Sequence, residues 1–250
     1  MPNTPILDVI GSKTDLFECL ESTNNYAMAA VHDGKAGHGY VCQALEQTAG
    51  RGQRGKTWYT GRNMNLALSA VLEPVHLRPT DIFLVSAAVA VAVRNWLNSY
   101  VPGCLIKWPN DIYIHDKKIA GILIENVIRG NKWKYAVAGI GVNINQEGFD
   151  PQLAHAVSLA MLTGKQYDIF QLGRELSACL ETAWKTLKHN PEQVTDSYNE
   201  YLYCKDKTVT FLDGNREFSA VVKYVTPSGE LVASGSEGEV MVPRGVKWLK

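Results

Sequence analysis

A glycine-spaced basic segment is the first part of the sequence that could do chemistry. Gly50–Gly55 has the sequence GRGQRG, and with Lys56 it supplies three cations, Arg51, Arg54 and Lys56. Glycine spacing exposes backbone N–H groups, and guanidinium groups offer paired donors, so the segment suits a carboxylate or a phosphate. A solvated hairpin tip is the alternative, and the segment alone does not choose between the two.

The same segment satisfies the G-x-G-x-x-G pattern of dinucleotide-binding proteins, and Glu73 follows about twenty residues later, where an acid that binds ribose would stand. That pattern must open a helix, because the pyrophosphate lies at the helix N-terminus. Residues 56–61 instead predict a continuing loop that leads into a strand. A dinucleotide-binding fold is therefore excluded, and a Walker A loop is absent because no Gly-Lys-Ser/Thr follows at the required spacing.

A second segment, Lys107-Trp108-Pro109-Asn110-Asp111, joins two predicted strands. Pro-Asn-Asp favours a turn, and the residue before a proline is extended, which fixes Lys107 relative to Asn110. The next hairpin carries Lys118 to the start of the following strand. An ammonium group there could neutralise a substrate carboxylate and the charge that develops on it. A structural turn and a solvated hairpin lysine are the alternatives.

Two glycines lie within a third segment, Gly139-Ile140-Gly141-Val142-Asn143, which otherwise has the pattern of a strand. Glycine weakens a strand and often marks the close approach of a ligand or of another backbone. A bulge without function is the alternative.

These segments must be positioned by strands and helices. Tyr40–Glu46 and Asn65–Leu72 predict strands on either side of the basic segment. Four further runs form a predicted antiparallel meander, because connections this short join only antiparallel neighbours. The runs are Leu105–Trp108, Ile112–His115, Ile119–Val127 and Trp133–Ile144. Helices are predicted over Thr23–His32, Thr80–Tyr100, Pro151–Leu162, Asp168–Lys188 and Pro191–Tyr203.

The pattern changes near residue 204. Five short predicted strands follow within fewer than fifty residues, separated by turns such as Asp213-Gly214 and Pro227-Ser228-Gly229. Short, closely spaced strands of this kind indicate a small, strongly bent barrel. We therefore expect two domains, over residues 1–204 and 205–250.

Composition limits the classes of partner. The chain has 250 residues, with 25 Lys+Arg against 25 Asp+Glu. A net charge of zero and one short basic loop argue against a nucleic-acid-binding module, which needs basic residues spread along a face. The five cysteines form no C-x-x-C pair, and the six histidines form no H-E-x-x-H unit, so the sequence identifies no metal ligands.

The predicted location is the cytoplasm. No basic start followed by an apolar run precedes Thr23, so no export signal is visible. The most apolar run, Ile82–Val93, would span about 18 Å as a helix, against a hydrocarbon core of about 30 Å. We therefore predict a buried helix and no membrane partner.

Taken together, the segments resemble one family, the biotin–protein ligases, also called biotin–[acetyl-CoA-carboxylase] ligases. They occur in the family's order over about residues 20–145. The matching segments are Glu21-Ser22-Thr23-Asn24, Gln47-Thr48-Ala49-Gly50-Arg51-Gly52, Trp58, Lys107–Asp111, Lys118-Ile119-Ala120-Gly121-Ile122-Leu123-Ile124-Glu125 and Gly139–Asn143.

The resemblance implies an α+β fold, in which a mixed or antiparallel sheet with packed helices forms a catalytic domain like that of class II synthetases. The tail resembles the family's small SH3-like C-terminal domain. The implied substrates are biotin and ATP with Mg²⁺, which give biotinyl-5′-AMP. A lysine of a biotin carboxyl carrier domain, from a biotin-dependent carboxylase, then takes the biotinyl group. A homodimer is possible.

The resemblance also implies roles for single residues, with Lys118 and Arg51 as the catalytic pair. Contacts to biotin are implied for Ser22, Thr23, Asn24, Gln47, Arg51, Gly52, Gln53, Lys118, Gly121, Gly139 and Gly141. Contacts to ATP and the adenylate are implied for Arg51, Arg54, Lys56, Trp58, Lys107, Asn110, Asp111 and Asn143.

Two departures from the family pattern bear on function. The family's usual loop is G-R-G-R-x-G, and Gln53 stands at the second arginine, which leaves open whether Arg54 or Lys56 takes its place. Only 21 residues precede Ser22, too few for the winged-helix domain of bifunctional members, so we expect a monofunctional ligase. The alternatives are a lipoate or octanoate ligase of the same fold, although its Arg-Arg-x-x-Gly-Gly-Gly stretch is not found, and a non-catalytic biotin or adenylate sensor.

Overall fold

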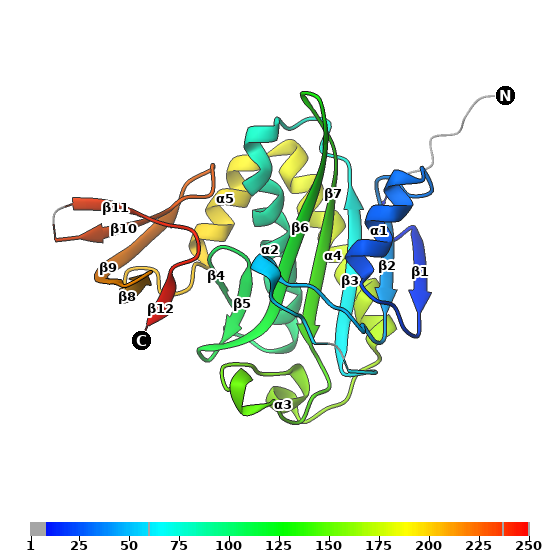
Figure 1. The fold of residues 1–250 in the computed structure, drawn as a ribbon, viewed down its shortest axis with the longest axis horizontal. Helices are drawn as coiled ribbons and strands as arrows, with labels where there is room; N and C mark the ends of the chain where they lie inside the picture. The colour runs from blue at the N-terminus through cyan, green and yellow to red at the C-terminus, as the bar shows by residue number, and fades with distance from the viewer. Residues whose placement is uncertain (1–8, 60, 237, 250) are drawn as a thin grey trace.

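A seven-stranded mixed sheet forms the centre of the protein (Figure 1). The structure is a computed structural model, and it describes residues 9–59, 61–236 and 238–249. The strand order is β1-β2-β3-β7-β6-β5-β4, with β1 parallel to β2 and every other neighbouring pair antiparallel. The strands are β1 (Lys13–Phe17), β2 (Tyr40–Ala44), β3 (Asn65–Leu72), β4 (Leu105–Lys107), β5 (Asp111–Ile114), β6 (Lys117–Arg129) and β7 (Lys132–Asn143). The predicted antiparallel meander of β4 to β7 is confirmed.

Helices cover both faces of this sheet. The helices are α1 (Thr23–His32), α2 (Ile82–Tyr100), α3 (Leu159–Thr163), α4 (Ile169–His189) and α5 (Pro191–Glu200), with 3₁₀ turns η1 (Gln53–Gly55), η2 (Pro79–Asp81) and η3 (Pro151–Leu153). On one face, Ala27 and Val31 of α1 pack on Val71, Val127 and Val137 of the sheet. On the other face, α2 and α4 pack on a larger core. Because both faces are covered, β3 is buried along its whole length.

The long apolar helix is part of this larger core. Over Pro79–Tyr100 the chain is long and apolar enough, by length and composition, to span a membrane. Every side chain from Ala87 to Val93 is nevertheless buried inside the protein, as predicted. The helix proper begins at Ile82 rather than Thr80, because Asp81 accepts hydrogen bonds from the backbone and side chain of Arg78 and closes a separate 3₁₀ turn first.

A second, smaller sheet follows at the C-terminal end, as expected for a small SH3-like domain. Its strands are β8 (Thr208–Asp213), β9 (Arg216–Val225), β10 (Leu231–Gly235), β11 (Gly238–Val242) and β12 (Lys247–Leu249). They pair antiparallel in the order β11-β10-β9-β8-β12. The indole N–H of Trp108 donates to the carbonyl of Gly229 at 3.1 Å, which joins this sheet to the first. The boundary between two domains at residue 204 remains a prediction. Residues 1–8 and 250, at the outer ends of the two predicted domains, lie outside the described residues.

Two features around the first sheet differ from the prediction. The predicted helix over Pro151–Leu162 is instead the 3₁₀ turn η3 followed by the five-residue helix α3. Between them the backbone pairs with the start of β6, since Lys118 N donates to His155 O at 2.6 Å and Val157 N donates to Lys118 O at 3.0 Å. In a continuous helix, the carbonyl of His155 and the N–H of Val157 would form hydrogen bonds within the helix instead. The edge strand β1 was not predicted, because five half-exposed residues gain their strand form by pairing with β2.

Candidate active site

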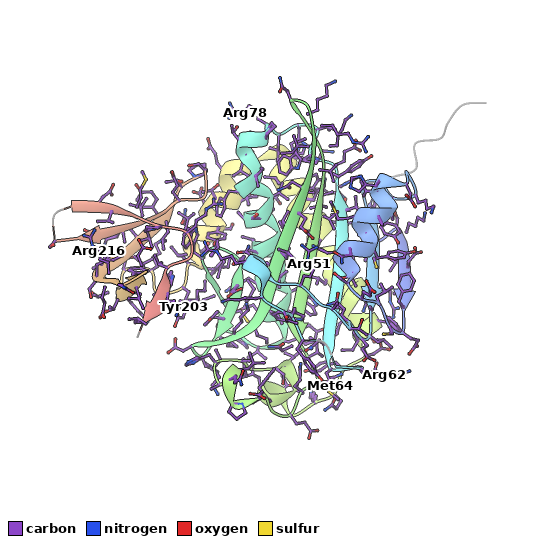
Figure 2. The ribbon with its side chains drawn as sticks, in the orientation of Figure 1. Arg51, Arg62, Met64, Arg78, Tyr203 and Arg216 are labelled. Carbon is purple, nitrogen blue, oxygen red and sulfur yellow. The ribbon has the colours of Figure 1, made fainter. Side chains whose placement is uncertain are left out.

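The floor of the candidate site comes from alternate residues of three neighbouring strands. Side chains alternate between the two faces of a strand, so Ser69 of β3, Gly121 of β6, and Gly139 and Gly141 of β7 lie on the face that α1 covers. The register places Gly139 opposite Ser69 and Gly141 opposite Gly121. The basic segment crosses this face, and Arg51 lies over the middle of the sheet (Figure 2). The three glycines therefore leave a shallow space between sheet and segment.

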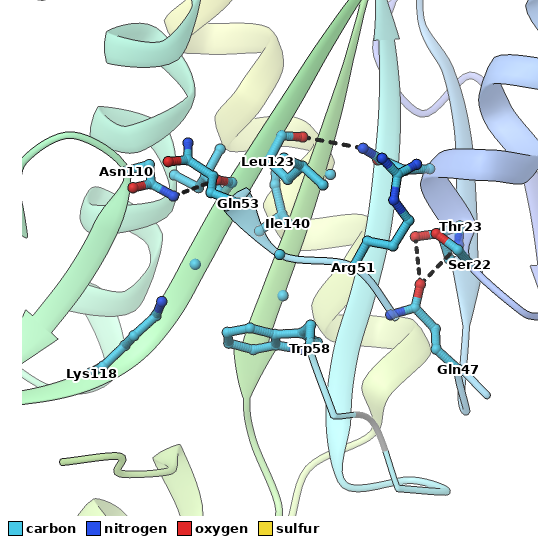
Figure 3. Close-up of a pocket in the computed structure, with 16 residues that line it drawn as sticks. Ser22, Thr23, Gln47, Arg51, Gln53, Trp58, Asn110, Lys118, Leu123 and Ile140 are labelled. Carbon is cyan, nitrogen blue, oxygen red and sulfur yellow. Dashed lines mark hydrogen bonds between the residues drawn. The ribbon is translucent and has the colours of Figure 1, made fainter. Parts of the chain in front are cut away.

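A cavity of about 50 Å³ occupies this space (Figure 3). That is much smaller than the roughly 300–1,000 Å³ of typical ligand sites, so a bound ligand requires side chains to move. The lining residues are Ser22, Thr23, Asn24, Gln47, Arg51, Gly52, Gln53, Trp58, Asn110, Lys118, Gly121, Ile122, Leu123, Gly139, Ile140 and Gly141. Every residue for which the resemblance implies a biotin contact is in this set, as are Trp58 and Asn110.

One end of the cavity is a buried hydrogen-bond network. The backbone N–H and the hydroxyl of Thr23 donate to Gln47 Oε1 at 2.8 and 3.1 Å. The Ser69 hydroxyl lies 2.8 Å from Thr23 Oγ1 and 2.7 Å from Asn24 Oδ1 and can donate to either. Asn24 fits only because residue 139 is glycine, since a Cβ there would lie 2.3 Å from Asn24 Oδ1. At this end, named the network end, the polar groups are held in place by one another.

The start of α1 supplies part of the network end. Ser22 is the N-cap, and its side chain accepts from the backbone N–H of Asn25 at 3.4 Å. Capping by serine satisfies one of the free N–H groups of the first turn and fixes Thr23 and Asn24 in the turn that faces the sheet. Ser22, Thr23 and Asn24 are all nearly inaccessible to solvent. The local sequence therefore sets this wall of the cavity.

The basic segment is a small hairpin rather than an open loop. Trp58 N donates to Gly50 O at 2.9 Å, and Gly52 N donates to Lys56 O at 2.7 Å. Gly50 is required at its base, because a Cβ would lie 2.2 Å from the carbonyl oxygen of Trp58. From the hairpin, Arg51 Nη2 reaches Glu125 Oε1 at 2.8 Å. The guanidinium group thus lies at the mouth of the cavity.

The indole of Trp58 fills the middle of the cavity. A Cβ on Gly141 would lie 2.3 Å from its ring, and a Cβ on Gly121 would lie 3.0 Å from it. The indole N–H is buried and donates to no acceptor among the described residues. A buried donor without an acceptor is costly, so this N–H is available to an acceptor atom of a ligand.

The other end of the cavity carries charge, and we name it the charged end. Lys118 Nζ lies 2.7 Å from Asp111 Oδ1 and 5.6 Å from the centre of the Trp58 ring. Asn110 Nδ2 donates to Ile122 O at 2.7 Å and holds the Pro-Asn-Asp turn against β6. Figure 3 shows Lys118 and Asn110 on the side opposite Thr23 and Gln47, with Trp58 between them.

Five residues with implied adenylate contacts do not line the cavity. Lys107 lies among the rings of Tyr113, Tyr203 and Trp248, at 4.5, 5.7 and 5.4 Å from their centres. Its ammonium donates to the Tyr113 hydroxyl at 3.3 Å. Burial, and then the nearby Asp111, raises the pKa of Tyr113 to about 12, so its phenol stays protonated at neutral pH. Lys107 thus braces the joint between the two sheets.

The other four differ in placement. Asp111 does not line the cavity but forms an ion pair with Lys118, which does. Asn143 donates to Val157 O at 3.1 Å and holds the chain beside β6. Arg54 lies against the backbone of Gly245, and Lys56 is exposed on the hairpin. Neither cation lines the cavity, whereas Gln53 does.

Sequence reasoning missed several residues of the site. Ile122, Leu123 and Ile140 line the cavity, but their apolar side chains are typical of any strand. Ser69 could have been found, because it is a lone hydroxyl in the apolar strand Asn65–Leu72. Glu125 was within a matched segment, and its strand period from Gly121 places both on one face.

Known proteins resemble this chain in sequence and in fold. The model of the biotin/lipoate A/B protein ligase family matches residues 16–143. The chain is 31% identical over 182 residues to the bifunctional ligase/repressor BirA of Bacillus subtilis (strain 168). The matched stretch is 71% of this chain and 55% of that protein. The chain therefore spans about half the length of that relative.

A second relative is similar over a longer stretch. The biotin–[acetyl-CoA-carboxylase] ligase of Mycobacterium tuberculosis is 27% identical over 234 residues, which are 90% of this chain and 84% of that protein. Among solved structures, the biotin protein ligase from Aquifex aeolicus in complex with biotin and ATP superimposes with a TM-score of 0.80. It is 19% identical and covers 96% of this chain and 99% of that one. This likeness shows the fold, including the second small sheet.

Proposed function

Because the chain belongs to the biotin/lipoate A/B protein ligase family, we propose that it activates biotin with ATP and transfers the biotinyl group to a lysine of a carrier protein. One observation carries the proposal: the three separate motifs converge on a single cavity that has Arg51 at its mouth and Lys118 at its charged end. The relatives, a biotin–[acetyl-CoA-carboxylase] ligase among them, favour biotin over another acid.

In the first step, an oxygen of the biotin carboxylate attacks the α-phosphorus of ATP. A P–O bond forms, the bond between the α-phosphorus and the oxygen that bridges to the β-phosphate breaks, and pyrophosphate leaves. The reaction brings two anions together, so the protein contributes mainly positioning and positive charge. Lys118 and Arg51 supply that charge, while Thr23 and Gln47 hold the polar head of the acid.

In the second step, the amine of the carrier lysine attacks the carbonyl carbon of the biotinyl adenylate. A C–N bond forms, the C–O bond to the phosphate breaks, AMP leaves, and the amine gives up a proton. The nucleophile belongs to the carrier, so this step needs no covalent intermediate on the protein. The hairpin over the cavity excludes water from the mixed anhydride in the interval.

Magnesium enters as part of the substrate MgATP. Mg²⁺ is commonly held by phosphate oxygens and one or two carboxylates. No group of three His, Cys, Asp or Glu side chains in residues 9–59, 61–236 and 238–249 could hold a metal. Asp111 and Glu125 are paired with Lys118 and Arg51, two cations that line the cavity.

The acceptor that we propose is a biotin carboxyl carrier domain of a biotin-dependent carboxylase. A cytoplasmic location and a possible homodimer remain predictions from the sequence. For the site, we propose Ser22, Asn24 and Gly52 with the network end as contacts to biotin, and Trp58 and Asn110 as contacts to the adenylate. Lys107, Asp111 and Asn143 support this arrangement from behind.

The test is ATP–pyrophosphate exchange on purified protein, with biotin, lipoate or octanoate in separate reactions. We expect exchange with biotin alone, followed by biotinylation of a purified carrier domain. Exchange with lipoate or octanoate instead would keep the adenylating chemistry and replace the acid. Binding of biotin without exchange with any acid would favour a non-catalytic sensor, and Gln53→Arg would then be the first variant to examine.

A further inference from the structure

The guanidinium of Arg51 joins the basic hairpin to two different walls of the cavity. Its Nη2 donates to Glu125 Oε1 at 2.8 Å, and its Nη1 lies 3.4 Å from Glu125 Oε2. The same Nη1 donates to Asn25 Oδ1 at 2.6 Å. Glu125 belongs to β6 and Asn25 to α1, so one side chain spans the mouth between helix and sheet.

The carboxylate of Glu125 is itself held in position. Asn24 Nδ2 donates to Glu125 Oε2 at 2.9 Å and to Leu123 O at 3.3 Å. Asn24 is 3% exposed, and the Ser69 hydroxyl lies 2.7 Å from its Oδ1. The orientation of Glu125 is therefore tied to the buried network end, and a fork-shaped guanidinium pairs with a fixed carboxylate in a defined geometry.

These contacts still leave Arg51 able to bind a ligand. A guanidinium has five N–H donors, and the contacts to Glu125 and Asn25 use three of them. The remaining donors are available to an anionic group in the cavity, which Arg51 lines. Holding the hairpin and contacting the ligand are therefore compatible roles of the same side chain.

We infer that Glu125 is a positioning residue, which acts through Arg51 to hold the basic hairpin across the mouth of the cavity and so to retain the acyl-adenylate until the carrier arrives. The inference rests on the proposed function for its intermediate, but the hold on the hairpin is a property of the protein alone. It also assigns a task to Asn24 and Asn25, which keep the two anchors in place.

The test compares Glu125→Gln with a matched control, Glu18→Gln. Glu18 pairs with Arg62 at the same 2.8 Å distance, and both side chains are about two thirds exposed. Arg62 lies away from Arg51 (Figure 2). The first readout is trypsin cleavage of the hairpin after Arg54 or Lys56, followed by mass spectrometry without any ligand. We expect cleavage about tenfold faster in Glu125→Gln, the size expected for one charge-assisted hydrogen bond, and wild-type cleavage in Glu18→Gln.

The second readout is retention of the intermediate. Protein loaded with biotin and ³²P-labelled ATP is passed through a desalting column, and the label that stays bound is followed over time. We expect Glu125→Gln to lose adenylate about tenfold faster than wild type. In an Arg51→Lys background the same change should add little, because a lysine cannot make the forked contact.

The outcomes separate the two proposals. Equal cleavage rates in wild type and Glu125→Gln would show that Glu125 does not hold the hairpin, whether or not the protein forms an adenylate. Faster cleavage with unchanged retention would overturn the role in keeping the adenylate. If wild type forms no adenylate with any acid, the proposed function fails while the cleavage result still decides the hold. Asn25→Ala, which removes the other anchor from an exposed position, gives the same cleavage test should Glu125→Gln fail to fold.

Discussion

The two ends of the cavity are built in different ways. At the network end, Thr23, Asn24, Gln47 and Ser69 are linked by hydrogen bonds of 2.7 to 3.1 Å. Gln47 is half-buried and the other three are buried. At the charged end, Lys118 is paired with a carboxylate. The Trp58 indole beside it fills space, and its N–H donates to no acceptor in the part of the chain that the structure describes. One end is complete without a ligand, whereas the other holds groups that a ligand must displace or engage.

This difference indicates which part of the reaction each end serves. A preformed polar network loses little entropy when it binds a neutral polar group, so it suits selection of the acid. A paired cation has to exchange its partner for a reacting anion, so its interaction is strongest where charge develops. The network end should therefore govern the affinity for the acid and the stability of the protein. The charged end should govern the rate of adenylate formation.

The largest expected effect is that of Lys118→Ala. Removing the ammonium takes away the positive charge at the charged end, and we expect ATP–pyrophosphate exchange to fall by about 10²–10³. Biotin affinity should change much less, because the network end is intact. The melting temperature should fall little, since Lys118 is one third exposed and its pair with Asp111 stabilises weakly. Near-normal exchange would remove Lys118 from the mechanism.

Gly139→Ala should have the next largest effect, on the network end. The new Cβ would lie 2.3 Å from Asn24 Oδ1, and Asn24 cannot move without breaking its contacts to Ser69 and Glu125. We expect a loss of about 2 kcal/mol in the free energy of unfolding, measured by urea denaturation. Calorimetry should show weaker biotin binding. A free energy of unfolding equal to that of the wild type would show that Asn24 can move aside without losing these hydrogen bonds.

Gly141→Ala is the matched change on the same strand, two residues away. Its Cβ would lie 2.3 Å from the Trp58 ring. Trp58 belongs to the hairpin, and when the ring moves its N–H breaks no hydrogen bond to any residue that the structure describes. We therefore expect a loss of less than about 1 kcal/mol in stability and a rise of about tenfold in the KM for ATP. If Gly141→Ala were as unstable as Gly139→Ala, the proposed difference between the two ends would be wrong.

The parts that sequence could predict are those set by local rules. The helix Thr23–His32, the strand Asn65–Leu72 and the hairpins around Lys118 follow from periodicity and turn residues, and the structure agrees. The positions of Lys107 and Arg54 could not be predicted. Lys107 lies beside Trp248 of the second sheet, and Arg54 lies against Gly245, in the turn between β11 and β12. Contacts between such distant segments leave no local pattern.

The same argument explains the errors along the sheet. Residues 155–157 lose their predicted helix because Lys118, far earlier in the chain, takes their backbone groups. The sequence assigned no role to Glu125, because its pairing with Arg51 joins segments 74 residues apart. Recognition of the family supplied most of the cavity residues. The supporting residues behind them needed the three-dimensional arrangement.

The smallest expected effect is that of Gly245→Ala, which tests whether the contact with the second sheet matters to the hairpin. Its Cβ would lie 1.4 Å from Arg54 Nη1, and its φ of +98° is unfavourable for alanine, which costs about 1 kcal/mol in stability. Gly103→Ala is the control, with a φ of +95° and open space around it. Arg54 is exposed and can swing aside, so we expect both variants to lose similar stability and to keep exchange within about threefold of wild type. A much larger loss of exchange in Gly245→Ala than in Gly103→Ala would show that the second sheet holds Arg54 in the position that the family gives to the arginine missing at Gln53. The charged end would then extend across both sheets.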